Sequence, residues 1–151
     1  MDISRQVRVP GPRERLFAYV DDLGRYPVWM DLVHGVEPVP IVGDEGAAWI
    51  VELRAKVGPL ARSKRLRMSR THLVSPTLAV FERRETDGRT HAPWILRAEV
   101  AAVADHDVEL TMNLHYGGSL WTGAVLERVL DSHVERGSQR LRELLTAPPT
   151  P

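Results

Sequence analysis

The chain contains no cysteine. Disulfides, thiolate metal sites and cysteine nucleophiles are therefore excluded. The chain has no excess of charge either, since 20 Lys and Arg residues balance 20 Asp and Glu residues. A balanced charge gives no electrostatic support for a nucleic acid or an anionic membrane as partner. No apolar run approaches the length of a membrane span, and the N-terminal residues MDISRQVRVP are not a signal peptide. We therefore expect a soluble cytoplasmic protein that binds no nucleic acid and has no stable membrane insertion.

Common catalytic signatures are missing as well. The sequence has no phosphate-binding glycine loop, no HExxH or GxSxG motif and no dinucleotide fingerprint. Its six histidines, at positions 34, 72, 91, 106, 115 and 133, show no spacing typical of metal ligands. We expect neither a metal site nor a bound cofactor.

A long amphipathic segment near the C-terminus is the most regular pattern in the chain. Leu126, Leu130 and Val134 belong to a row of apolar residues at helical spacing, with Glu, Arg, Asp and Gln on the other side. The pattern predicts a helix over residues 122–147, capped by Thr122 and ended by a Pro-Pro pair.

The apolar stripe of this helix also contains Gly123 and Gly137. A glycine inside a helix costs about 1 kcal/mol relative to alanine, so two on the buried face call for a reason. They indicate either close packing of the helix against backbone or space left for a ligand. His133 lies at the edge of the stripe, a position more typical of a half-buried packing residue than of a catalytic one.

The N-terminal part predicts one strand followed by two short helices. Residues 3–9 alternate as a strand and end at a proline- and glycine-rich break. Residues 13–22 are typical of a short helix with Gly24 as its C-cap. Residues 25–30 are too aromatic for a solvent loop and predict a second short helix, with Trp29 as a hydrophobic plug at one end of the core.

The middle of the chain alternates as strands separated by turns. Residues 49–57, Leu53 among them, put apolar side chains on one face, and a Gly-Pro pair turns the chain. Pairing across this turn sets Trp49 beside Met68 on the apolar face. It also sets Glu52 opposite Arg65 on the outer face, so both strands agree on which face is apolar.

Counting residues across the following turns places polar side chains toward the interior. Arg70 and His72 project to the apolar side of their strand. A four-residue loop at Ser75-Pro76 puts Arg70 next to Phe81, and the turn at Asp87-Gly88 puts Phe81 beside Trp94. A buried arginine must be paired or hydrated. Its partner is expected to be a ligand oxygen or trapped water, or, as the alternative, Glu82 or Glu85 in a structural ion pair.

Two further strands complete the sheet. In the first of them, alternate residues from Trp94 onward, Leu96 among them, point to the apolar face. In the second, over residues 108–116, Met112, Leu114 and Tyr116 point to the same face. A smaller apolar set lies on the opposite face, which indicates either a bulge that inverts part of the assignment or a dimer patch; its members are Leu73, Leu78, Val80 and Ile95. We expect a monomer or a homodimer.

This order of elements predicts an α+β fold. An antiparallel sheet with one apolar face and one long amphipathic helix bury their apolar surfaces when the sheet curls around the helix. We expect a single domain over residues 1–147, in which a curved antiparallel β-sheet wraps around a long C-terminal α-helix and two short helices close one end. Residues 148–151 are expected to form a disordered tail.

Three segments carry a resemblance to a known superfamily. They are the opening IxRxVxVPGPRERLFAYVDDLGRYPVWM, the central hairpin AAWIVELRAKVGPLARSKRLRM and the closing LTMNLHYGGSLWTGAVLERVL. The layout resembles the helix-grip (SRPBCC, START-like) superfamily, which includes birch-pollen allergens, START-related lipid-transfer domains and the polyketide cyclase/dehydrase group. The resemblance implies a hydrophobic cavity between sheet and helix that binds a lipid, steroid, polyketide or hormone-like ligand. It is specific for the fold and poor for function, because the ligands differ within the superfamily.

The chain is also similar to bacterial aromatase/cyclases in two places. Residues 26–29, Tyr-Pro-Val-Trp, resemble their aromatic-Pro helix, and their cavity arginine falls at Arg70. Their pocket tyrosine falls near Val33, so the chain departs from the aromatase/cyclase pattern at this position.

Three functions remain open from the sequence. The first is a cofactor-independent cyclase or dehydratase of small-molecule metabolism, with Arg70 as oxyanion donor and His72 and Tyr116 as further catalytic candidates. The second is a non-catalytic carrier or sensor of a hydrophobic small molecule. The third is a protein-interaction module with a vestigial cavity. For the first two we expect these ligand-binding residues: Trp29, Trp49, Leu53, Met68, Phe81, Trp94, Leu96, Met112, Leu114, Leu130, His133 and Gly137.

Overall fold

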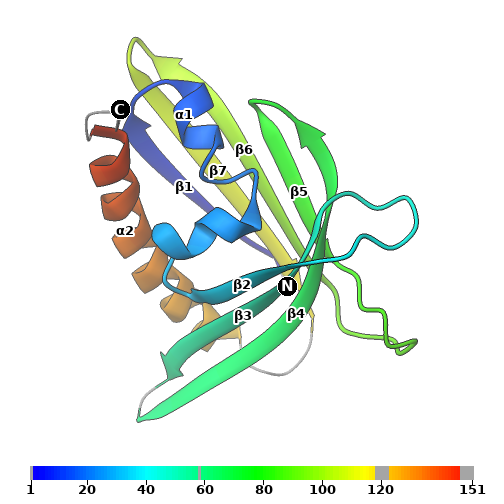
Figure 1. Cartoon of the computed structure of the whole chain (residues 1–151). Helices are drawn as coiled ribbons and strands as arrows, with labels where there is room; N and C mark the ends of the chain where they lie inside the picture. Colours follow the sequence, from blue (N-terminus) through cyan, green and yellow to red (C-terminus); the bar gives the residue numbers. More distant parts are fainter. Residues whose placement is uncertain (1, 58, 118–122, 147–151) are drawn as a thin grey trace.

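One antiparallel sheet and one long helix make up most of the molecule (Figure 1). The computed structural model describes residues 2–57, 59–117 and 123–146. The seven strands lie in the order β1-β7-β6-β5-β4-β3-β2. Their bounds are β1 Asp2–Pro10, β2 Val33–Val39, β3 Ala48–Val57, β4 Leu60–Val74, β5 Leu78–Arg83, β6 Trp94–Ala104 and β7 Asp107–Tyr116. The helices are α1 Arg13–Phe17, the 3-10 helix η1 Leu23–Val28, and α2 Gly123–Thr146.

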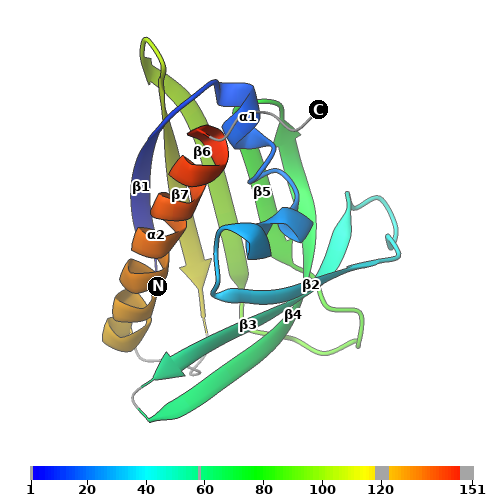
Figure 2. The ribbon, with the colours of Figure 1, turned by 60° about the vertical axis from the view of Figure 1, so that its left-hand side comes forward.

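The sheet curves around α2, as the view in Figure 2 shows. α2 lies along β1 and contacts β3, while α1 contacts β6 and η1 contacts β2. The predicted α+β helix-grip fold is therefore confirmed, with two short helices beside α2 on the concave side of the sheet. The predicted Thr122 cap and the tail over residues 148–151 lie outside the described residues.

The core lies between the concave face of the sheet and the helices, and it follows the alternation of the strands. In β1, Ile3, Val7 and Val9 are buried, whereas Ser4 and Arg8 between them are exposed. This period of two is what a strand with one solvated face requires. The described part of α2 buries Leu130, Leu141 and Leu145 against it, while the side chain of Leu126 lies outside the described residues.

The short helices differ from the prediction in their boundaries. α1 ends at Phe17 rather than at residue 22, because the chain tightens into i→i+3 turns from Leu16 onward. Asp22 is extended and its side chain accepts a hydrogen bond from Gly24 N at 2.7 Å, so it caps η1. Gly24 therefore lies inside the second helix and is not the C-cap of the first.

The hairpin of β3 and β4 has the predicted register. Trp49 pairs with Met68, Val51 with Leu66, and Glu52 with Arg65. The pairing continues to Val57, which lies opposite Leu60.

A β-bulge in β4 changes the next pairing. Arg70 pairs with Phe81 as predicted, but His72 pairs with Val80, so Thr71 is the extra residue. Because one inserted residue reverses the alternation, His72 points away from the interior and is exposed. The bulge also divides the predicted outer apolar set, since Leu73 now pairs with Ala79, a buried residue of the inner face.

The pairing of β5 with β6 is displaced by two residues from the prediction. Phe81 pairs with Leu96 and not with Trp94. A displacement by an even number of residues keeps each side chain on its face. Trp94, Ala98 and Val100 are accordingly all buried, as the predicted inner face requires.

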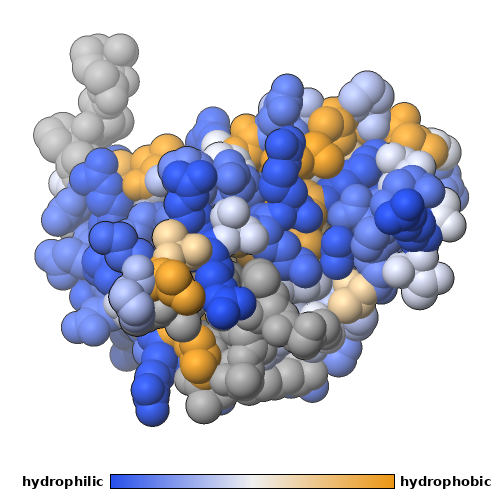
Figure 3. All heavy atoms as spheres, turned by 90° about the horizontal axis from the view of Figure 1, so that it is seen from below, coloured by the Kyte–Doolittle hydropathy of each residue, from blue (hydrophilic) through white to orange (hydrophobic). Residues whose placement is uncertain are grey.

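The face of the molecule seen from below (Figure 3) is largely polar. Hydrophilic residues cover most of the face shown in Figure 3, where apolar residues form separate spots. No helix in the described ranges is long and apolar enough to cross a membrane.

Candidate functional site

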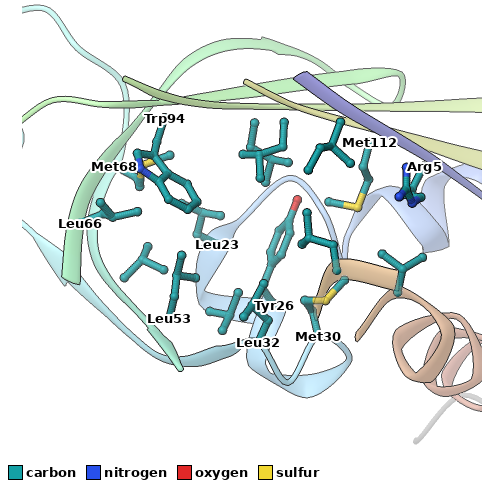
Figure 4. Close-up of a pocket in the computed structure, with 17 residues that line it drawn as sticks. Arg5, Leu23, Tyr26, Met30, Leu32, Leu53, Leu66, Met68, Trp94 and Met112 are labelled. Carbon is teal, nitrogen blue, oxygen red and sulfur yellow. The ribbon is translucent and has the colours of Figure 1, made fainter. Parts of the chain in front are cut away.

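A small cavity lies between the concave face of the sheet, the η1 segment and α2 (Figure 4). Its volume is about 110 Å³. Its wall is built almost entirely from apolar side chains of six strands, η1, the turn after η1 and α2. The lining residues are Ile3, Arg5, Leu23, Tyr26, Met30, Leu32, Val33, Val51, Leu53, Leu66, Met68, Trp94, Leu96, Met112, Leu114, Leu130 and Val134.

More than half of the predicted ligand-binding residues lie on this wall. The sheet contributes Leu53, Met68, Trp94, Leu96, Met112 and Leu114, and α2 contributes Leu130. They come from five different elements, and the predicted inner faces of the strands bring them together.

The predicted aromatic residues that do not line the cavity pack next to it. Phe81 lies 5.8 Å from Trp49 and 6.2 Å from Tyr26, both ring centroid to ring centroid and edge-on. Trp29 lies 5.1 Å from Tyr26, and its Nε1 donates to Tyr19 O at 2.9 Å. These rings fill the core behind η1, so Trp29 acts as the predicted plug.

Gly137 belongs to this packed region and not to the cavity wall. A Cβ added at Gly137 would lie 3.1 Å from Trp29 O and 3.2 Å from its ring atom Cε3. The glycine on the apolar stripe therefore provides close packing of α2 against the backbone of residue 29, which is the first of the two predicted alternatives.

Arg70 lies outside the cavity, contrary to the sequence-based prediction. Its Nη1 donates to the backbone carbonyl of Asp21 at 2.8 Å. Its guanidinium carbon also lies 6.0 Å from the centroid of the Trp49 ring, within cation–π range. Among the described residues, the partners of this arginine are thus the chain segment before η1 and the Trp49 ring, and not Glu82 or Glu85. Counting residues across turns could not predict this contact, because it joins residues that are 49 positions apart.

The other two catalytic candidates are also absent from the cavity wall. His72 is exposed because of the bulge, and its Nδ1 lies 3.4 Å from Thr71 Oγ1. Tyr116 is buried against Trp94, with ring centroids 5.5 Å apart. Burial raises the pKa of Tyr116, and the negative charge of Glu127 raises it further. The structure does not bring Arg70, His72 and Tyr116 together.

Polar groups on the cavity wall are few and mostly paired. The hydroxyl of Tyr26 donates to Val20 O at 3.0 Å, and complete burial raises its pKa. Arg5, at one end of the cavity, forms an ion pair with Asp131 on α2, with Nε and Oδ1 2.6 Å apart. The buried Nε1 of Trp94 has no hydrogen-bond partner among the described residues. Arg5 shares its face of β1 with the buried residues Ile3 and Val7, but no sequence signal gave it a role.

His133 does not line the cavity, although it lies one helical turn from Leu130 on α2. Its Nδ1 forms a short hydrogen bond with Asp31 Oδ1, and Arg136 Nε donates to Asp31 Oδ2 at 3.1 Å. Burial raises the pKa of the Asp31 carboxyl, but the hydrogen bonds from His133 and Arg136 outweigh burial and hold that pKa below its usual value.

A buried ion pair lies on the opposite, convex face of the sheet. Both side chains of Arg67 and Glu45 are almost fully buried, with exposed fractions of 6% and 4%. Arg67 donates to both Glu45 oxygens at 2.9 Å, and also to the carbonyls of Pro40 and Arg84. Hydrogen bonds from Arg67 lower the pKa of Glu45, and burial raises it by less. Arg67 lies between the cavity-lining residues Leu66 and Met68 on β4, but its side chain is on the other face of the sheet, where the pair ties the β2–β3 loop to β4.

No group of three or more His, Asp or Glu side chains in the described ranges is arranged to hold a metal ion.

Comparison with known proteins gives matches in structure only. No protein-family model matches the chain, and no curated protein matches it. A START superfamily protein from Mycobacterium smegmatis is similar, with a TM-score of 0.69 and 13% identity over 95% of this chain and 96% of that one. A conserved protein from Geobacillus kaustophilus has a TM-score of 0.71 and 11% identity, over 96% of this chain and 95% of that one.

The di-domain ARO/CYC protein BexL from the BE-7585A biosynthetic pathway is similar over 99% of this chain, with a TM-score of 0.67 and 12% identity. The match covers 51% of that protein, so this chain spans about half of its length. At such low identity the likeness concerns the fold. The chain thus has the helix-grip fold, which a START superfamily protein and an ARO/CYC protein share with it.

Proposed function

We propose that this protein binds a small hydrophobic molecule in the cavity and holds it chemically unchanged, as a carrier or sensor. The observation that carries the proposal is the apolar wall of the cavity, which the sheet, η1 and α2 build together. Burying apolar surface stabilises a complex by about 25 cal/mol per Å². An apolar cavity that water occupies poorly is a favourable site for an apolar ligand. The helix-grip fold supports the same role.

The size of the cavity limits the ligand. Pockets for drug-sized molecules usually have about 300 Å³ or more. A volume of about 110 Å³ is closer to an apolar cavity of about 150 Å³ that takes up benzene. We therefore expect a ligand whose buried part is about the size of one ring, or a larger ligand that moves α2 or η1 apart from the sheet.

A cyclase- or dehydratase-type enzyme is the second candidate, favoured by the likeness to the ARO/CYC protein. Such an enzyme needs a donor for a developing oxyanion and an acid or base within reach of the substrate. On the described wall, the Tyr26 hydroxyl is bonded to Val20 O and Arg5 is paired with Asp131, while the Nε1 of Trp94 has no described partner. An indole N–H can donate to an oxyanion, but it serves as neither acid nor base. The three catalytic candidates from the sequence lie elsewhere, so the geometry favours binding without reaction.

Methionine signals offer a direct test of ligand binding. Three of the four methionines, Met30, Met68 and Met112, line the cavity. We expect toluene, added to protein labelled with ¹³C at the methionine methyl groups, to shift these three signals in a saturable manner.

A cavity-filling variant provides the control. In Leu114→Trp the larger ring occupies the cavity, and the toluene shifts should disappear while circular dichroism still shows the native fold. Leu60→Trp adds the same ring at a side chain that is 59% exposed, and should leave them intact. Unchanged methionine signals in the wild type at saturating toluene, or equal shifts in Leu114→Trp, would contradict the proposal.

A further inference from the structure

A second concave site, which we call the basic groove, lies outside the cavity between β3 and α2. Its volume is about 510 Å³. β2 pairs with β3 only as far as Leu53, so beyond that residue the groove separates this edge of β3 from α2. The groove is lined by Arg54, Ala55, Lys56, Ala61, Arg128, Val129, Ser132, His133 and Arg136.

The charged side chains that line the groove all have one sign. Four of its lining residues are Arg or Lys, and none is Asp or Glu, although the chain as a whole has equal numbers of both signs. Arg54 lies 3.5 Å from Glu52, with side chains 51% and 33% exposed, so this ion pair is weak. Arg136 is paired with Asp31, which is not a lining residue, at 3.1 Å and contributes less free positive charge. Lys56 and Arg128 have no ion-pair partner among the described residues. Like charges that face one another across a concave surface attract an anion.

His133 adds a buried polar group to the groove. The residue is 8% exposed, and its Nδ1 is bonded to Asp31, which fixes the orientation of the ring. Its Nε2 makes no hydrogen bond with any described residue. A histidine ring nitrogen can donate or accept a hydrogen bond, so Nε2 is the polar atom that His133 offers to a ligand in the groove.

The basic groove and the cavity are neighbours on the same two elements. On β3, Leu53 lines the cavity and Ala55 lines the groove. On α2, Leu130 lines the cavity and Val129 lines the groove. A molecule with an apolar part in the cavity therefore has a cationic surface on the adjoining side of α2 and β3.

We infer that the basic groove binds the carboxylate end of an amphipathic ligand whose apolar end occupies the cavity, an inference that rests on the binding role proposed above. The cavity alone is too small for most metabolites and offers few polar partners. The groove supplies the missing volume and the complementary charge, and the guanidinium groups suit a carboxylate because they donate two parallel hydrogen bonds.

A matched pair of ligands tests this inference on the full chain. 4-Phenylbutyrate and 4-phenyl-1-butanol share a ring and a chain and differ in the charged end. Their Kd values are measured at low ionic strength from the methyl shifts of Met30, Met68 and Met112. We expect the acid to bind about tenfold more tightly than the alcohol. High salt should reduce this preference, because salt screens exposed charges.

Two double variants show whether the groove causes the preference. In Lys56→Glu/Arg128→Glu the acid should lose its advantage over the alcohol. Arg8→Glu/Arg89→Glu makes the same change in net charge at exposed residues outside the groove, and should keep the preference.

The possible outcomes separate the two proposals. If the alcohol binds and the acid binds no more tightly, the role of the groove is wrong while cavity binding stands. The same holds if both double variants lose the preference equally, since the effect is then one of overall charge. If neither ligand shifts the cavity methionines, the proposed function fails, and the inference fails with it.

Discussion

Breaking the buried ion pair between Arg67 and Glu45 should destabilise the fold strongly. In Arg67→Met, the Glu45 carboxylate loses two hydrogen bonds of 2.9 Å and remains in a site where its side chain is only 4% exposed. The carbonyls of Pro40 and Arg84 lose their donor as well. Removing one partner of a buried pair typically costs about 3–5 kcal/mol. For a chain of this size that corresponds to a decrease in Tm of about 6–20 °C.

The double variant Arg67→Met/Glu45→Leu should be more stable than either single variant. It leaves no unpaired charge, and buried ion pairs can often be replaced by apolar residues at little cost. Urea unfolding followed by circular dichroism measures the three free energies of unfolding. The exposed pair of Arg97 and Glu99 is the control, because its side chains are 50% and 46% exposed and Arg97→Met should cost less than about 1 kcal/mol. The reasoning is refuted if Arg67→Met lowers the free energy of unfolding by no more than Arg97→Met does. It is also refuted if the effects of the Arg67 and Glu45 changes are strictly additive.

The same pair predicts a dependence on pH. Arg67 holds the pKa of Glu45 below its ordinary value of 4.5. The ion pair therefore contributes its full stability above about pH 4.5 and loses it as the pH falls through the lower pKa of the folded state. Below pH 4.5 the wild type should lose stability relative to the double variant. A constant difference between the two proteins down to the acid transition would contradict this.

Two further variants test positions that the sequence singled out. Arg70→Met should lower the free energy of unfolding by about 1–2 kcal/mol, because the hydrogen bond to Asp21 O is lost. The affinity for toluene should not change. A tenfold loss of affinity in a stable variant would instead give Arg70 a role in binding. Leu130→Asp should abolish cooperative unfolding, because an unpaired buried charge costs several kcal/mol, and a folded variant in urea titration would show that this face of α2 tolerates a charge.

The period of the apolar residues was sufficient to predict the architecture. Strands with one solvated face alternate at every second residue, so the inner face of β3 and the register of Trp49 with Met68 followed from the sequence. The stripe on α2 was equally clear. Local patterns of this kind depend on neighbours within a few residues, which the sequence displays directly.

The site was harder to predict because it depends on features without a period. The extra residue Thr71 reverses the direction of His72, and no composition signal marks a bulge of this kind. The hydrogen bond of Arg70 to Asp21 and the cover over Arg67 both come from loops distant in the sequence. Tyr26 and Met30 line the cavity because η1 folds over the sheet, and its boundaries depend on the cap at Asp22.

The three methionines on the cavity wall have a consequence for how selective the site can be. A methionine side chain is unbranched and polarisable, and it changes rotamer at low cost, so a wall with Met30, Met68 and Met112 adapts its shape to different guests. Such a wall discriminates weakly between hydrocarbons of similar size. It is also vulnerable to oxidants, because conversion of a thioether to its sulfoxide puts a strong dipole into an apolar space. Peroxide would then expel an apolar guest without any change in the backbone, and reduction of the sulfoxide would restore the site.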